Sequence, residues 1–125
     1  MNKINLLIAD DHTMFLQGIM SLLEQEPNIT IVDTAINGIE ALEIIKKGNI
    51  DFIILDISMP EMDGIELSKI LKKEHPNVRI LIVSTHSNVM IISRLIRIGV
   101  NGYLLKSWKK NIFRTVLKLK NRFLI

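Results

Sequence analysis

The sequence predicts an α/β fold in which five parallel strands form one doubly wound sheet with helices on both faces. Short apolar runs alternate along the chain with longer segments whose apolar residues recur at helical spacing. Strands that alternate with helices pair in parallel through right-handed crossovers. The chain has 125 residues, which suits a single domain. We therefore expect one domain over 1–125 and a sheet with the strand order 2-1-3-4-5.

The segment 50–64 is the centre of this prediction. It reads I-D-F-I-I-L-D-I-S-M-P-E-M-D-G, and its unbroken apolar run at 52–55 is typical of a strand buried on both faces. The run stops at Asp56, where a carboxylate replaces the apolar side chains. Met59-Pro60 and Asp63-Gly64 then indicate a loop. Ligands of open parallel sheets bind outside the carboxyl ends of the strands, so Asp56 is a candidate functional residue.

The first half of the chain predicts two further strands and two helices. Strands are expected at 4–9 and 29–36, where branched apolar residues are frequent. A helix is expected at 13–26, where apolar residues recur at helical spacing: Phe15, Leu16, Ile19, Met20, Leu22 and Leu23. A second helix is expected at 38–48, with these residues on its apolar side: Ile39, Leu42, Ile44 and Ile45.

The second half repeats the alternation. A helix is expected at 65–74, followed by a strand at 78–83. The next helix, at 89–98, has Gly99 as its C-terminal stop. A last strand at 102–105 and a last helix at 111–123 complete the pattern.

Composition excludes several classes of site. The chain has no cysteine, so disulfides, thiolate metal sites and cysteine nucleophiles are excluded. No apolar run approaches the roughly 18 residues of a membrane span, and the start does not resemble a signal peptide. We therefore expect a soluble cytoplasmic protein. A net charge of +3 does not by itself indicate a nucleic-acid binder.

Polar residues follow four of the five expected strands, and all of these strand ends lie at the same edge of a parallel sheet. They are Asp10 and Asp11, Asp56, Ser84 and Thr85, and Lys106. Three carboxylates in one crevice repel one another unless a cation shares them. Oxygen ligands with open positions suit Mg²⁺, which binds through a few carboxylates together with phosphate oxygens. A carboxylate at such a site can act as a nucleophile and become an aspartyl-phosphate.

These residues carry a family resemblance over nearly the whole chain. The motifs are I-A-D-D-H at 8–12, L-D-I-S-M-P-E-M-D-G at 55–64, I-V-S-T-H at 82–86 and G-Y-L-L-K at 102–106. Together and in this order they resemble the receiver domain of a two-component response regulator. They are most similar to the NarL/FixJ-type (LuxR-type) transcriptional regulators.

The resemblance implies a phosphorylation switch. Asp56 would be the phosphoacceptor, and Asp10, Asp11, Asp56 and the backbone carbonyl of Ser58 would hold Mg²⁺. Ser84 would be the switch hydroxyl, Tyr103 the switch aromatic residue and Lys106 the lysine that pairs with the phosphoryl group. The implied partners are a sensor histidine kinase, a second copy of the chain, and DNA through a C-terminal domain that this chain lacks.

Some alternatives stay open. Tyr103 is equally consistent with simple packing, and Ser107 stands where many receivers have proline, which leaves the geometry of that peptide undecided. The histidines (His12, His75 and His86) are interpreted as loop residues rather than metal ligands, and a place for His86 in the lining of the site stays open. A stand-alone receiver that acts by protein contact is the alternative to an excised domain. A flavodoxin-like cofactor binder and an aspartate-dependent phosphatase would share the topology, but their usual motifs after the first strand are absent.

The helix at 89–98, the strand at 102–105 and the last helix are expected to form an interaction surface. If Ile92, Leu95 and Ile96 face the core, Met90 and Ile91 lie near solvent beside Arg94. The last helix adds a basic row (Arg114, Lys118 and Arg122) beside an apolar stripe (Ile112, Val116, Leu119 and Phe123). A solvated basic helix face is the alternative interpretation.

Overall fold

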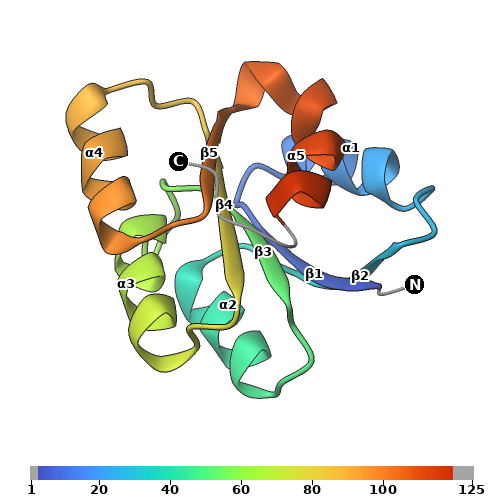
Figure 1. Ribbon diagram of the computed structural model, residues 1–125, viewed down its shortest axis with the longest axis horizontal. Coiled ribbons are helices and arrows are strands. Elements are labelled where there is room, and N and C mark those ends of the chain that lie inside the picture. The colour runs from blue at the N-terminus through green and yellow to red at the C-terminus, as the bar shows by residue number, and fades with distance from the viewer. Residues whose placement is uncertain (1–2, 120–125) are drawn as a thin grey trace.

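A computed structural model describes residues 3–119 of the chain (Figure 1). Its strands are β1 (Ile4–Ala9), β2 (Ile29–Ala35), β3 (Phe52–Leu55), β4 (Arg79–Ser84) and β5 (Gly102–Leu105). Its α-helices are α1 (Thr13–Leu23), α2 (Gly38–Lys46), α3 (Gly64–Glu74), α4 (Val89–Ile98) and α5 (Ile112–Leu119), and a 3-10 helix, η1 (Lys106–Asn111), precedes α5. Within residues 3–119, no helix has the length and apolar character needed to cross a membrane.

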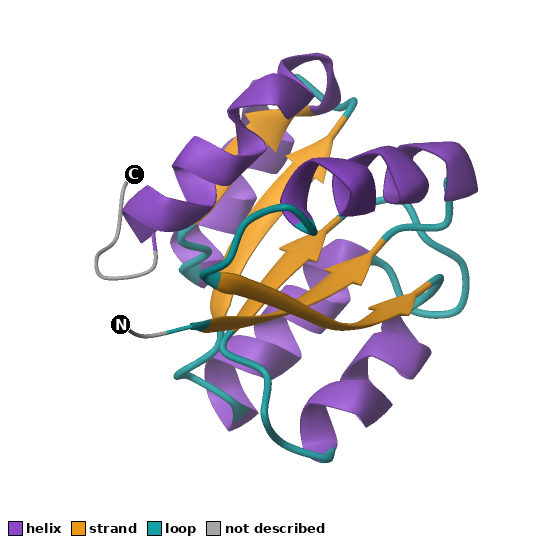
Figure 2. Cartoon of the chain, turned by 90° about the vertical axis from the view of Figure 1, so that its right-hand side faces the viewer, coloured by secondary structure: helices purple, strands orange, loops and turns teal. Residues whose placement is uncertain are grey.

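All neighbouring strands are parallel, and their order is β2-β1-β3-β4-β5, which confirms the predicted topology. Figure 2 shows this twisted sheet between two layers of helices. The carboxyl ends of β1, β3, β4 and β5 therefore meet at one edge of the sheet, where the polar residues singled out in the sequence follow the strands.

The strands alternate their side chains between two apolar cores. Leu7 and Ala9 of β1 point to the core that α2, α3 and α4 cover, through residues such as Ala41, Leu67 and Leu95. Leu6 and Ile8 point to the opposite core, which α1 and α5 cover. Successive side chains of a strand face opposite sides of a sheet, so an unbroken apolar run is what a sheet covered on both faces requires.

Side chains at the helix ends fix where three of the helices begin. Asn37, Asp63 and Asn88 are the N-cap residues of α2, α3 and α4, and each accepts hydrogen bonds from backbone N–H groups of the first turn. Gly99 ends α4 in the left-handed conformation with a φ of 105°, as predicted.

Several boundaries differ from the predicted ones by one to three residues. β4 begins at Arg79 and includes Ser84, so this serine is the last residue of the strand rather than the first residue after it. The helix expected to begin at residue 111 is preceded by η1. α1 ends at Leu23, three residues before its expected end. The expected end of the last helix, including Arg122 and Phe123, lies outside the described residues.

One predicted core residue in each of two helices, Ile96 of α4 and Ile39 of α2, faces solvent instead. Ile96 of α4 is 41% exposed, while Ile91 is half-buried and packs against the core beside the fully buried Leu95. In α2, Ile39 is exposed and Ala41 is buried instead. Both helices carry more apolar residues than one face can bury, so their helical period alone does not choose the face.

Candidate functional site

The structure brings the three predicted carboxylates and the predicted lysine together. Lys106 follows β5, and its Nζ lies 2.9 Å from Asp10 Oδ2 and 3.3 Å from Asp56 Oδ2. Both of these acids are 3% exposed, whereas Asp11 remains exposed. One ammonium group therefore neutralises part of the charge of two buried carboxylates, and we call Asp10, Asp11 and Asp56 the acidic cluster.

Asp56 is held in a defined orientation. Its Oδ1 accepts a hydrogen bond from the backbone N–H of Ile57 at 2.8 Å, which leaves Oδ2 facing Lys106. Burial raises the pKa of the Asp56 carboxyl above its usual value, and the charge of Asp10 adds to this. Lys106 opposes the shift. A cation beside this carboxyl therefore favours its ionised form, which is the nucleophilic form.

The loop after β3 is packed so closely that two glycines are required. A Cβ on Gly64 would lie 2.3 Å from the carbonyl oxygen of Asp56, and a Cβ on Gly38 would lie 2.3 Å from that of Met62. The N–H of Gly64 donates to Ile57, and that of Gly38 donates to Met62. These contacts fix the loop that begins at Asp56 against the N-termini of α2 and α3.

His12 lies in the acidic cluster, although the sequence analysis treated it as a loop histidine. Its Nδ1 is 3.1 Å from Asp10 Oδ1, 3.4 Å from Asp11 Oδ1 and 3.6 Å from Asp56 Oδ2. Lys106 Nζ is 2.9 Å from the same nitrogen. The only signal in the sequence was that His12 directly follows the two aspartates, which leaves the direction of the ring undecided.

The acidic cluster and His12 have the spacing of a metal site. One ligand atom from each of Asp10, Asp11, His12 and Asp56 lies within 4.8 Å of all the others. Carboxylate oxygens are ligands that Mg²⁺ prefers. These residues therefore fit a divalent cation bound mainly through oxygen.

A second network surrounds Ser84 and is centred on His86. The backbone N–H of His86 donates to Ser84 Oγ at 3.2 Å, and its carbonyl accepts from the Tyr103 hydroxyl. Its Nε2 lies 2.9 Å from Ser58 Oγ. Burial raises the pKa of Tyr103; the hydrogen bond with Ser84 opposes this and the charge of Asp56 adds to it. His86 thus joins the loops that follow β3 and β4.

The other residues singled out in the sequence lie outside the acidic cluster in the described part of the chain. Thr85 is exposed, and His75 is the C-cap of α3. Within residues 3–119 there is no cis peptide bond, so the Lys106–Ser107 peptide is trans. The backbone carbonyl of Ser58 as a metal ligand stays a prediction.

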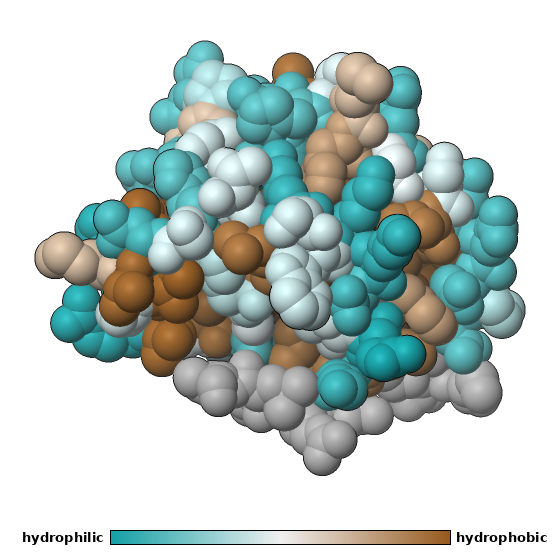
Figure 3. Space-filling model, turned by 90° about the horizontal axis from the view of Figure 1, so that it is seen from above, coloured by the Kyte–Doolittle hydropathy of each residue, from teal (hydrophilic) through white to brown (hydrophobic). Residues whose placement is uncertain are grey.

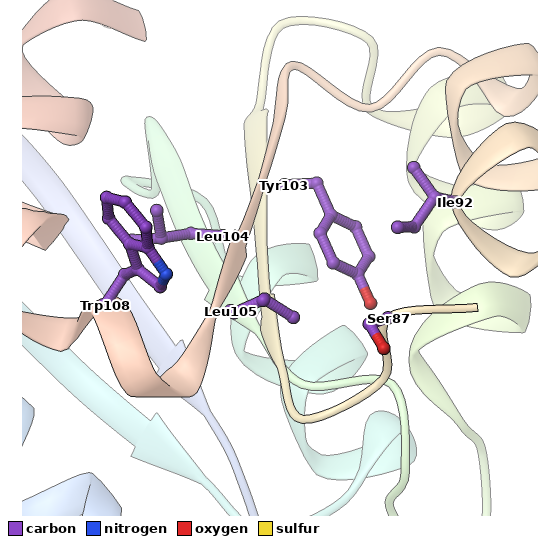
Figure 4. A pocket seen from close by; sticks show the side chains of 6 residues that line it. All are labelled: Ser87, Ile92, Tyr103, Leu104, Leu105 and Trp108. Atoms are coloured by element: carbon purple, nitrogen blue, oxygen red, sulfur yellow. The ribbon is translucent and has the colours of Figure 1, made fainter. Parts of the chain in front are cut away.

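The predicted interaction surface carries exposed apolar side chains. Val89 and Met90 at the start of α4 are 74% and 80% exposed. Figure 3 shows apolar surface gathered at the left of its view, over α4. A pocket of about 290 Å³ lies beside this surface, and Figure 4 shows its lining side chains on both sides of β5: Ser87, Ile92, Tyr103, Leu104, Leu105 and Trp108.

Comparison with known proteins finds one family model. The model described as "Response regulator receiver domain" matches residues 6–118. The transcriptional regulatory protein DegU of Brevibacillus brevis is 36% identical over 84% of this chain and 44% of its own length. The nitrate/nitrite response regulator NarL of Escherichia coli is 34% identical over 81% of this chain and 47% of its own length. The chain spans about half the length of these relatives.

Solved structures give the same result for the fold. The receiver domain of the putative response regulator NarL from Mycobacterium tuberculosis is 30% identical, with a TM-score of 0.90, and the match covers 97% of this chain and 98% of that chain. The isolated receiver domain of RcsB from Salmonella enterica, with a beryllofluoride phosphomimetic, is 28% identical with a TM-score of 0.90, and the match covers 98% and 93%.

Proposed function

Because the chain belongs to the response regulator receiver domain family, we propose that Asp56 accepts a phosphoryl group from a sensor histidine kinase in the cytoplasm. The observation that carries this proposal is the pairing of Lys106 Nζ with Asp56 Oδ2 at 3.3 Å and with Asp10 Oδ2 at 2.9 Å. A carboxylate at a strand end, beside a buried ammonium group, can attack an anionic phosphoryl donor without full charge repulsion.

The transfer balances as a displacement at phosphorus. A carboxylate oxygen of Asp56 forms the new P–O bond while the P–N bond of the donor phosphohistidine breaks. The imidazole of the donor leaves with the electron pair. Lys106 is placed to pair with a phosphoryl oxygen as charge develops there, because its Nζ already lies within reach of the Asp56 carboxylate.

Mg²⁺ is the cofactor we propose for this step, held by Asp10, Asp11, Asp56 and the backbone carbonyl of Ser58. When bound, the cation supplies positive charge that lowers the repulsion between donor and acceptor. Asp10 supports this assignment, because it is buried and its two oxygens face different partners: Oδ2 faces Lys106 and Oδ1 faces His12.

The switch that follows phosphorylation is proposed to run through Ser84. In the structure the Ser84 hydroxyl accepts a hydrogen bond from the backbone N–H of His86, and the carbonyl of His86 accepts one from the Tyr103 hydroxyl. A phosphoryl group on Asp56 would draw the Ser84 hydroxyl toward its own oxygens and would weaken its bond to His86. The loop between β4 and α4 and the ring of Tyr103 would then move together, which shifts a two-state equilibrium at α4 and β5.

The output of this switch is proposed to be transcription. The support is that the relative DegU is a transcriptional regulatory protein and that both relatives named above are about twice as long as this chain. DNA would then be contacted through a C-terminal domain outside residues 1–125, and a second copy of the chain is a candidate partner of the α4–β5–α5 face. A receiver that acts by protein contact alone is the alternative.

The phosphoacceptor is tested by mass. The protein is incubated with acetyl phosphate and Mg²⁺, and its intact mass is measured. We expect one phosphoryl group on the parent, none on Asp56→Asn, and one on the control Asp33→Asn, whose carboxylate is exposed on β2. A phosphorylated Asp56→Asn variant, or an unmodified parent, contradicts the assignment.

A further inference from the structure

We propose that His12 is a nitrogen ligand in the metal position, so that the protein binds borderline divalent cations such as Co²⁺ and Zn²⁺ more tightly than Mg²⁺. The inference rests on the proposed function in one respect, since the same carboxylates would hold either kind of ion. It goes beyond that function by adding a ligand and a second class of cation.

The spacing of the donor atoms supports this assignment. The distances from His12 Nδ1 to Asp10 Oδ1, Asp11 Oδ1 and Asp56 Oδ2 are 3.1, 3.4 and 3.6 Å. Two ligands that lie about 2.0–2.2 Å from one tetrahedral ion are separated by about 3.4 Å. The imidazole nitrogen thus lies near ligand spacing from each of the three oxygens, and one ligand atom from each of the four residues lies within 4.8 Å of the others.

The contact with Lys106 shows which way the lone pair of the imidazole points. An ammonium group has only hydrogens to offer, so Nδ1 is the acceptor in the 2.9 Å contact with Lys106 Nζ. Its lone pair is therefore turned into the acidic cluster and not toward solvent. A divalent cation that binds there would take this lone pair in place of Lys106 Nζ, which would move away from Nδ1 and stay beside Asp10 Oδ2 and Asp56 Oδ2.

His12 has no other structural task in the described part of the chain. It is the N-cap residue of α1, yet its side chain makes no capping hydrogen bond, and the side chain is 60% exposed. Its backbone N–H, which any residue here supplies, donates to Asp10 Oδ1 at 2.8 Å. Removing the ring therefore removes no helix cap and leaves this backbone hydrogen bond in place.

The chemistry of the two kinds of cation predicts the selectivity. Imidazole is a good ligand for Zn²⁺ and its neighbours, whereas Mg²⁺ prefers oxygen and retains several waters. Mg²⁺ is thus expected to leave the ring of His12 unused. Co²⁺ and Zn²⁺ already bind oxygen sites more tightly than Mg²⁺ does, and here they gain a nitrogen ligand as well.

The test is a calorimetric titration with Co²⁺ and, separately, with Mg²⁺, on the parent and on His12→Ala. We expect loss of the ring to weaken Co²⁺ binding by about tenfold or more, and so to lower the ratio of Co²⁺ to Mg²⁺ affinity by a similar factor. The control is His75→Ala, which removes a histidine at the C-cap of α3, outside the acidic cluster. It should leave this ratio as it is in the parent.

The visible absorption of bound Co²⁺ provides a second readout, because it depends on the ligands of the ion. We expect the spectrum of the parent to change in His12→Ala and to be kept in His75→Ala. An unchanged spectrum and an unchanged affinity ratio in His12→Ala overturn the inference, and so does a loss of Co²⁺ affinity in the control. Failure of the proposed function appears elsewhere, as a parent that is not phosphorylated with Mg²⁺ present.

Discussion

Replacing Lys106 by methionine tests the electrostatics of the site most directly. The side chain of Lys106 is 10% exposed, and its Nζ is the ammonium shared by Asp10 and Asp56, whose side chains are 4% and 3% exposed. Methionine keeps most of the apolar stem beside Phe15, whose ring centre lies 4.5 Å from Nζ. The substitution therefore removes the charge while keeping much of the packing.

The expected cost is several kcal/mol. At distances of 2.9 and 3.3 Å, each pair is worth about 5 kcal/mol before desolvation, at an effective dielectric constant of about 20. Much of this is offset by the cost of burying the ammonium. Removing one partner of a buried pair costs about 3–5 kcal/mol in measured cases, because the remaining charge is buried and unpaired. We expect Lys106→Met to lower the free energy of unfolding by about 3 kcal/mol near neutral pH without divalent cations.

The pH dependence gives the sign of the effect. The pKa of Asp56 is already raised by burial and by Asp10, and Lys106 holds it down. An acid whose pKa is higher in the folded than in the unfolded state favours folding below its unfolded pKa, and this contribution is lost as the pH rises through the folded pKa. Without Lys106 the folded pKa rises further. The deficit of Lys106→Met should therefore shrink on acidification and grow toward neutral pH.

The assay is urea unfolding followed by circular dichroism, in the presence of a chelator. Lys109→Met is the matched control, because Lys109 is an exposed lysine of η1. In the Asp56→Asn background, the loss of Lys106 should cost at least about 1 kcal/mol less, since only one acid is then left unpaired. A Lys106→Met variant as stable as the control near neutral pH, or equally destabilised in the Asp56→Asn background, would refute the reasoning.

Two further predictions concern the loop after β3 and the α4 face. Gly64→Ala is expected to lower the free energy of unfolding by about 1–3 kcal/mol, because its Cβ would meet the carbonyl oxygen of Asp56 at 2.3 Å. Gly18→Ala in α1, where a Cβ meets nothing within 4 Å, should instead raise the free energy of unfolding by about 0.5–1 kcal/mol. Urea unfolding measures both variants. If Gly64→Ala is the more stable of the two, the packing argument is wrong. On the α4 face, beryllofluoride is expected to promote self-association in sedimentation experiments. Met90→Glu should weaken this self-association by about tenfold, whereas the control Met14→Glu on α1 should leave it unchanged. An equal effect of both substitutions excludes α4 as the output face.

The order of elements was predictable because it depends on the local pattern of the sequence. Short unbroken apolar runs such as 52–55, bounded by loop signals, are typical of strands buried on both faces, and their alternation with helices leaves few topologies. A parallel sheet then places every strand end at one edge, so the meeting of Asp10, Asp56 and Lys106 followed from their positions in the chain. The distances bear out this convergence.

The sequence by itself therefore determined the fold, the family and the charged groups that converge at the strand ends. Tertiary structure decided what depends on packing between elements. It turned Ile91 rather than Ile96 toward the core, because α4 has more apolar residues than one face can bury. It also turned the ring of His12 into the acidic cluster and made His86 the link between Ser58 and Ser84. The direction of a side chain in a loop depends on neighbours that are far away in the sequence. The local spacing of apolar residues therefore does not predict it.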